Sequence, residues 1–304
     1  MNYLLIVAFC LLLGSKAKHF LVKLDSSLQD KHSKVYTENP TDDENNKNNA
    51  NIRDGDDYGL EISGNNDEVF EGDMMLTKEQ REFMAAHVLK KGQRKGQGRN
   101  AIIGKKYRWP KNTLTYRFDP KFTNEQKLLV KRALGKLQSK LPNCIRFEEY
   151  STGFGHVVLV KNIESNGCNA DAGYNGLILH QNMNLGAGCF NTGTIQHEFL
   201  HSLGLWHTQS CSDRDQYVEI KLENVKEEAK YNFERYDPSA ITHYGLPYDF
   251  ESVMHYKGRA FSKNLGLTIR TLDPTKQHLI EHEWGVERGV SKGDVQLLRK
   301  LYSC

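Results

Sequence analysis

The residues most able to do chemistry are two histidines and a glutamate within residues 192–205. His197 and His201 are four positions apart, and Glu198 directly follows the first of them. In an α-helix, residues four apart project from the same face one turn apart, so both imidazoles can reach one metal ion. Glu198 lies beside that face, where its carboxylate can act as a general base. The spacing therefore predicts a zinc-binding helix.

A third histidine, His207, extends this pattern. In a continuous helix its Cα lies about 9 Å beyond that of His201 along the axis, which is too far for a compact site. Gly204 stands between the two histidines and can adopt the positive φ that ends a helix. The chain can then turn back and bring His207 to the metal. Three imidazoles with one open position form the ligand set of a catalytic zinc.

The elements that must position these residues show mixed patterns. Leu114, Tyr116 and Phe118 alternate with polar residues, which predicts a half-buried strand. Thr123 and Gln126 form a capping-box pattern ahead of an amphipathic helix. The remaining patterns predict strands at 147–150, 157–160 and 177–179, helices at 192–205 and 292–301, and an irregular region at 208–290.

The N-terminal third differs in composition from the rest of the chain. A ten-residue apolar segment, 4–13, precedes Gly14-Ser15-Lys16-Ala17, so residues 1–17 are interpreted as a secretory signal peptide. The segment is too short to span a bilayer, so no membrane association is expected after its removal. Residues 18–99 are predicted to be a largely disordered pro-region, apart from a short helix that Thr77 caps. The basic linker at 90–99 suits cleavage by a trypsin-like protease.

Charge and cysteine content narrow the class of protein further. The 304 residues contain 41 basic and 38 acidic side chains, and a net charge of +3 gives no reason to expect a nucleic-acid partner. Cys10 lies in the signal peptide, which leaves five cysteines in residues 100–304. In a secreted chain these cysteines indicate disulfides, of which at most two can form, and their spacing leaves the pairing open.

The zinc pattern also resembles a known family. His197-Glu198-x-x-His201-x-x-Gly204-x-x-His207 resembles the metzincin zinc motif, and Asp213-Arg214-Asp215-Gln216-Tyr217-Val218 resembles the astacin branch of that group. Ser252-Val253-Met254-His255-Tyr256 is similar to the astacin Met-turn. The resemblance covers residues 100–304. It implies an α+β, metzincin-type, two-lobed catalytic domain with one Zn²⁺. The upper lobe would hold a twisted, mainly parallel sheet and two long helices, and the lower lobe would be largely irregular with a C-terminal helix.

The resemblance also assigns roles to single residues. Met254 would lie beneath the zinc, and Tyr256 would be a displaceable ligand that stabilises the transition state. Phe70-Glu71-Gly72-Asp73-Met74 resembles the astacin aspartate switch, in which Asp73 would bind the zinc of a latent precursor. The same matching implies the disulfides Cys144–Cys304 and Cys168–Cys189.

Two positions depart from the family pattern. Astacins carry a Glu directly after the third zinc-binding histidine, and this chain has Thr208 there. In the family that Glu anchors the newly freed N-terminus, so the resemblance does not carry this anchoring over. The family Arg three positions later is replaced by Cys211, the cysteine left over from the implied pairing.

Taken together, these features predict a secreted, monomeric zinc endopeptidase that hydrolyses protein or peptide substrates and is made as a latent precursor. A substrate strand is expected to pair with an exposed sheet edge formed by Gly176, Leu177, Ile178, Leu179 and His180. The alternative is a secreted, zinc-stabilised binding protein or toxin without catalysis, which has no need of Glu198. Another metzincin branch is opposed by Tyr256 and by the lack of a cysteine in residues 18–99.

Overall fold

The computed structural model describes residues 69–90, 101–150, 155–281 and 289–304, all within one compact unit, 56–304. The signal peptide expected at 1–17, the pro-region up to residue 68 and the linker from 91 to 99 lie outside the described residues.

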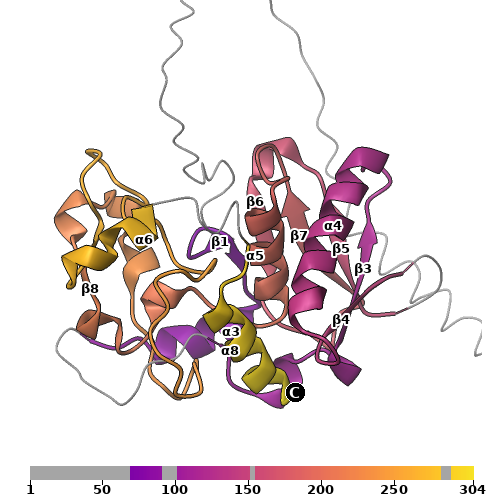
Figure 1. Cartoon of the computed structure of the whole chain (residues 1–304), viewed down its shortest axis with the longest axis horizontal. Coiled ribbons are helices and arrows are strands. Elements are labelled where there is room, and N and C mark those ends of the chain that lie inside the picture. The colour runs from indigo at the N-terminus through magenta and orange to yellow at the C-terminus, as the bar shows by residue number, and fades with distance from the viewer. Residues whose placement is uncertain (1–68, 91–100, 151–154, 282–288) are drawn as a thin grey trace, which may run out of the picture. The chain divides into compact units, whose positions relative to one another are not determined.

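A seven-stranded mixed sheet forms the framework, in the order β1-β2-β6-β7-β5-β3-β4 (Figure 1). The strands β3, β4, β5 and β7 run parallel to one another, β6 runs antiparallel to β7, and β2 runs parallel to β6. The strands are β1 Val69–Phe70, β2 Met74–Met75, β3 Thr113–Phe118, β4 Arg146–Glu149, β5 Val157–Lys161, β6 Cys168–Asp171 and β7 His180–Leu185. The mainly parallel sheet expected from the sequence is present.

Helix starts follow the caps that the sequence contains. Thr77 and Gln80 form the capping box of α3 (Lys78–Ala86), and Thr123 and Gln126 form that of α4 (Asn124–Lys140). Asn191 caps α5 (Thr192–Ser202) by accepting a hydrogen bond from the Thr194 backbone. In each case the cap satisfies a backbone N–H that the first helical turn leaves without a partner.

The main core lies between the sheet and the helices α4 and α5, which run beside each other (Figure 1). The C-terminal helix α8 (Lys292–Tyr302) contributes its buried apolar side chains to this core, namely Leu297, Leu298, Leu301 and Tyr302. Two disulfides, Cys144–Cys304 and Cys168–Cys189, also join elements around it.

Residues 208–281 are largely irregular, as expected, with short 3₁₀ turns. Their regular elements are the antiparallel strands β8 Val218–Ile220 and β9 Ile269–Thr271, and the helix α6 Gln277–Glu281. A separate apolar cluster that includes Val225, Phe233, Ile269 and Ile280 holds this part together. None of the helices that the structure describes has the length and apolar composition needed to cross a bilayer.

Two expectations from the sequence are wrong. The strand expected at 177–179 is a turn, and the strand begins only at His180 because Asn175 and Gly176 start the turn. The helix expected at 192–205 ends at Ser202, and Gly204, the residue expected to end it, takes a φ of +94°. A short apolar run does not reveal where a turn interrupts it.

Packing against α4 gives a direct test of this core. Leu137 is fully buried, whereas Leu128 on the same helix is 47% exposed. We predict that Leu137→Ala lowers the free energy of unfolding by about 2–5 kcal/mol, because truncation leaves a cavity. Leu128→Ala is the matched control and should change it by less than about 0.5 kcal/mol. Urea unfolding of both variants measures the difference, and equal losses would contradict the packing described.

Candidate metal centre

The helix α5 presents His197 and His201 from one face, as their spacing requires. Their Nε2 atoms are 3.0 Å apart, and His201 is fully buried. Two nitrogen lone pairs directed at each other at this distance repel unless a cation or a proton lies between them. The pair is therefore arranged as two ligands of one ion.

Gly204 brings the third histidine to the same point. Its positive φ ends the helix, and its amide donates a hydrogen bond to the carbonyl of His201. A Cβ at this position would lie 3.1 Å from Ile102 Cγ2, so the backbone also packs closely here. His207 then returns to α5, with its ring centroid 4.8 Å from that of His201.

The Nδ1 atoms of the three rings all face oxygen acceptors. His197 Nδ1 donates to the carbonyl of Val253 at 2.7 Å, and His201 Nδ1 donates to that of Leu205 at 2.9 Å. His207 Nδ1 lies 2.8 Å from Glu71 Oε2. A proton on Nδ1 leaves Nε2 with its lone pair, so these contacts orient three Nε2 atoms toward a common centre.

A carboxylate completes the group. Asp73 is fully buried, and its oxygens lie 3.0, 3.4 and 3.2 Å from the Nε2 atoms of His197, His201 and His207. One donor atom from each of the four residues lies within 4.8 Å of the others. Tetrahedral ligands at zinc distances are separated by about 3.3 Å, and the 3.0–3.4 Å between Asp73 and the three imidazoles is compatible with that spacing.

A tight turn delivers Asp73 to this position. The strands β1 and β2 form a hairpin, and its turn contains Glu71 with φ +46° and Gly72 with φ +85°. Glycine adopts a positive φ without steric cost, so Gly72 explains why the chain can reverse here. The hairpin carries Asp73 toward the histidines while β2 pairs with the sheet.

Burial and charge set the ionisation of the group. Burial would raise the pKa of Asp73, but the neighbouring His207 and His201 lower it well below its usual value. Burial lowers the pKa of His201 to about 4. An ionised carboxylate and a neutral imidazole are the forms that bind a metal. His207 differs, because burial lowers its pKa but Asp73 and Glu71 together raise it to about 9.

Glu198 lies beside the centre but outside the ligand group. It is 1% exposed, and its Oε2 atom has no hydrogen-bond partner among the described residues. Burial raises the pKa of Glu198 well above its usual value, and the charge of Asp73 raises it further. A buried carboxyl oxygen without a partner is costly and indicates a functional position.

Tyr256 and Met254 lie close to the third histidine. The Tyr256 ring centroid is 4.7 Å from that of His207, but its hydroxyl donates to the backbone carbonyl of Glu71. Tyr256 is thus not in the ligand group here, because residue 71 holds its hydroxyl. Met254 is fully buried in the main core, and its carbonyl accepts from the Thr208 amide at 3.0 Å.

Sequence reasoning assigned no role to Glu71. Its carboxylate is fully buried, with one oxygen on His207 Nδ1 and the other accepting from the Ser210 hydroxyl at 2.7 Å. The sequence signal for this role was its position two residues before Asp73, because two residues on either side of one turn residue can contact the same side chain. Two carboxylates of one hairpin, those of Glu71 and Asp73, therefore both contact His207.

The segment proposed to bind substrate lies elsewhere on the sheet than expected. Gly176, Leu177, Ile178 and Leu179 form an exposed turn, and His180 opens β7, which is an interior strand. The strand next to α5 that could accept a further strand is β6, and β2 already pairs with it through Met74–Ala170 and Met75–Asp171. The expectation of a free sheet edge at 176–180 is therefore wrong.

With this geometry in view, sequence comparison identifies the family. Residues 101–303 match the profile of Astacin, a peptidase family. The chain belongs to the astacin family. Its sheet and helices resemble those of high choriolytic enzyme 1, a hatching enzyme zinc-protease from Oryzias latipes, with a TM-score of 0.54 and 27% identity. That similarity covers 65% of this chain and 93% of the hatching enzyme.

Curated relatives extend over more of the chain. It is 32% identical to the zinc metalloproteinase dpy-31 of Teladorsagia circumcincta over 94% of its length, and that match covers 46% of the relative. It is also 32% identical to the meprin A subunit beta of Homo sapiens over 78% of its length, covering 30% of the relative. The chain thus spans less than half the length of these relatives.

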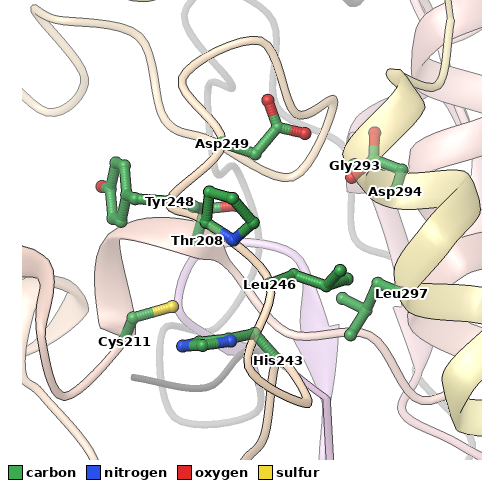
Figure 2. A pocket seen from close by; sticks show the side chains of 10 residues that line it. Thr208, Cys211, His243, Leu246, Tyr248, Asp249, Gly293, Asp294 and Leu297 are labelled. Carbon is green, nitrogen blue, oxygen red and sulfur yellow. The ribbon is translucent and has the colours of Figure 1, made fainter. Parts of the chain in front are cut away.

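The two departures from the astacin pattern share one small cavity. Thr208 and Cys211 line it together with His243, Tyr248 and Asp249 (Figure 2). Cys211 is buried and belongs to neither disulfide. Thr208 is 2% exposed and carries no charge, so it cannot form the ion pair that an astacin Glu makes from this position.

Glu71 supplies the prediction for this site. We expect Glu71→Gln to lower the free energy of unfolding of the full-length chain by about 1–3 kcal/mol, because it weakens buried hydrogen bonds of a charged group. Glu82→Gln, an exposed residue of the same segment, should change it by less than about 0.5 kcal/mol. Denaturant titration distinguishes the two, and a neutral Glu71→Gln variant would show that His207 does not depend on this carboxylate.

Proposed function

We propose that this chain is the latent precursor of a secreted zinc endopeptidase, and that residues 100–304 are its catalytic domain. The observation that carries the proposal is the buried Asp73 carboxylate, 3.0–3.4 Å from the Nε2 atoms of three histidines. Membership of a peptidase family and relatives named as zinc metalloproteinases support it. A carboxylate at this point takes the position that a catalytic centre must keep open.

The chain's own residues would divide the work of hydrolysis. His197, His201 and His207 would hold a zinc ion, which would supply Lewis-acid chemistry to polarise the scissile carbonyl and acidify water. Glu198 would accept the proton of the attacking water and deliver it to the leaving amine, a role worth about 10²–10⁴-fold in rate. Tyr256 would donate its hydroxyl hydrogen bond to the oxyanion.

Latency would rest on three contacts of residues 69–75. Asp73 faces the histidines, the Glu71 carbonyl holds the Tyr256 hydroxyl, and β2 covers the edge of β6. Cleavage within 90–99 by a trypsin-like protease would let this segment leave. A substrate peptide would then pair with β6, and the exposed turn at 176–179, together with His180, would contact its side chains.

The proposed setting follows from the N-terminal sequence. Residues 1–17 would direct secretion, and the released enzyme would act as a soluble monomer on proteins or peptides, without nucleic-acid partners. The alternative, a zinc-stabilised binding protein, does not account for Glu198, which is buried beside the ligands at the cost of its own hydration.

Metal removal and one substitution test the catalytic part of the proposal. We expect a chelator to abolish peptide cleavage by the activated enzyme and zinc to restore it. Glu198→Gln should retain zinc and lower kcat by at least about 10²-fold. Glu164→Gln, at an exposed position, is the control and should keep full activity. A Glu198→Gln enzyme with full activity would favour another mechanism.

The latency contact is tested in the uncut precursor. Asp73→Ala should raise its activity toward a small peptide about 10–100-fold, since charge-assisted contacts of about 1.5–3 kcal/mol are lost. Glu79→Ala is the control. Glu79 lies in the same pro-region as Asp73 but is exposed and pairs with Lys106, so its loss should leave the precursor inactive. If Asp73→Ala is equally silent, steric cover alone imposes latency.

A further inference from the structure

Asp294 is a buried carboxylate that the proposed mechanism does not use. It is the third residue of α8 and is 2% exposed. Its Oδ1 atom accepts a hydrogen bond from the Ser252 hydroxyl at 2.6 Å. Its Oδ2 atom accepts from the backbone amides of Val253 at 3.0 Å and Ser291 at 2.9 Å. Three donors thus converge on one carboxylate.

Two of these donors belong to the loop that supports the histidines. Val253 donates its amide to Asp294, and its carbonyl accepts the Nδ1 proton of His197 at 2.7 Å. Ser252 Oγ, which donates to Asp294, also accepts from the Met254 amide at 3.0 Å. A single residue therefore separates Asp294 from a hydrogen bond to the first histidine.

Helix capping alone does not explain these contacts. The capping box of α8 requires the bond between the Ser291 amide and Asp294, and the bond between the Asp294 amide and Ser291 Oγ at 2.9 Å. The bonds to Ser252 and Val253 add nothing to the helix. They join α8 to a loop that lies about 40 residues earlier in the chain.

A second carboxyl group lies beside Asp294. Asp249 lies on the neighbouring loop, and both residues line the cavity in which α8 forms one wall (Figure 2). Burial raises the pKa of Asp249 to about 6, and the negative charge of Asp294 contributes to this. Asp249 in turn accepts a hydrogen bond from the Ser291 hydroxyl. Ser291 thus donates to both carboxyl groups, through its amide to Asp294 and through its hydroxyl to Asp249.

We infer that Asp294 is a positioning residue of the metal centre. By holding Ser252 and Val253, it places the Val253 carbonyl where that carbonyl fixes the ring orientation and tautomer of His197. Such outer partners of a metal ligand typically change metal affinity or activity by about 10–100-fold when they are removed. The inference rests on the proposed function, because it assumes that the three histidines bind zinc.

The test compares alanine variants of the full-length chain. Zinc affinity is measured by competition with a chromophoric chelator, and the melting temperature is measured on the metal-free protein. Asp294→Ala should weaken zinc binding about 10–100-fold. Ser291→Ala, the matched control, removes the other half of the capping box. It should lower the melting temperature by a few degrees but keep zinc affinity within about twofold.

A second variant covers the case in which Asp294→Ala does not fold. Ser252→Ala leaves the α8 cap intact and removes the hydroxyl between Asp294 and Met254, so it should also weaken zinc binding several-fold. After activation it should lower kcat and leave KM nearly unchanged, because the substrate edge at β6 is untouched.

The outcomes separate this inference from the proposed function. A wild-type chain that binds no zinc would overturn the proposed function itself. The positioning role would be overturned if the wild type binds zinc and the zinc affinities of the variants that fold, Asp294→Ala and Ser252→Ala, lie within twofold of that of Ser291→Ala.

Discussion

One arrangement governs the rest of the structure: three imidazole nitrogens and a carboxylate converge on one largely buried point, where only the His197 side chain is partly exposed, at 14%. His201, His207 and Asp73 are almost completely inaccessible. Grouping so many polar atoms away from water is costly unless each atom has a partner, and a cation at their centre satisfies all of them together. The elements around this point are best understood by how each supplies or orients one of its atoms.

The scaffold divides this task among elements that are distant in sequence. The helix α5 presents two nitrogens at a spacing set by helix geometry, and Gly204 turns the chain so that the third can approach. Val253, Leu205 and Glu71 each hold the far side of one ring. The hairpin of β1 and β2 delivers the carboxylate and at the same time extends the sheet. The same short hairpin thus places a carboxylate at the metal centre and covers the edge of the sheet.

The sequence predicted those parts of the site that local spacing determines. His197, Glu198 and His201 follow from helical periodicity, and Gly204 indicates where the helix must end. Asp73 came from a family resemblance, because no local pattern connects a residue with a partner 124 positions away. The capping boxes at Thr123 and Thr77 were also readable, since both of their bonds lie within four residues.

What escaped prediction depends on long-range pairing. Glu71 and Asp294 look like ordinary surface acids in the sequence, and only tertiary contacts with His207 and Ser252 give them a role. The apolar run at 177–179 predicted a strand, because apolar runs are usually buried. These three residues are instead exposed in a turn. The sheet edge beside the site could not be assigned without knowing that β2 occupies it.

The central claim is that Asp73 completes the metal centre of the uncleaved chain. Anomalous diffraction at the zinc absorption edge, from crystals of the zinc-loaded full-length protein, tests this most directly. The account predicts one zinc peak about 2.0–2.2 Å from the Nε2 atoms of His197, His201 and His207 and from one oxygen of Asp73. A zinc ion at the three histidines with Asp73 turned away and water in its place would contradict it.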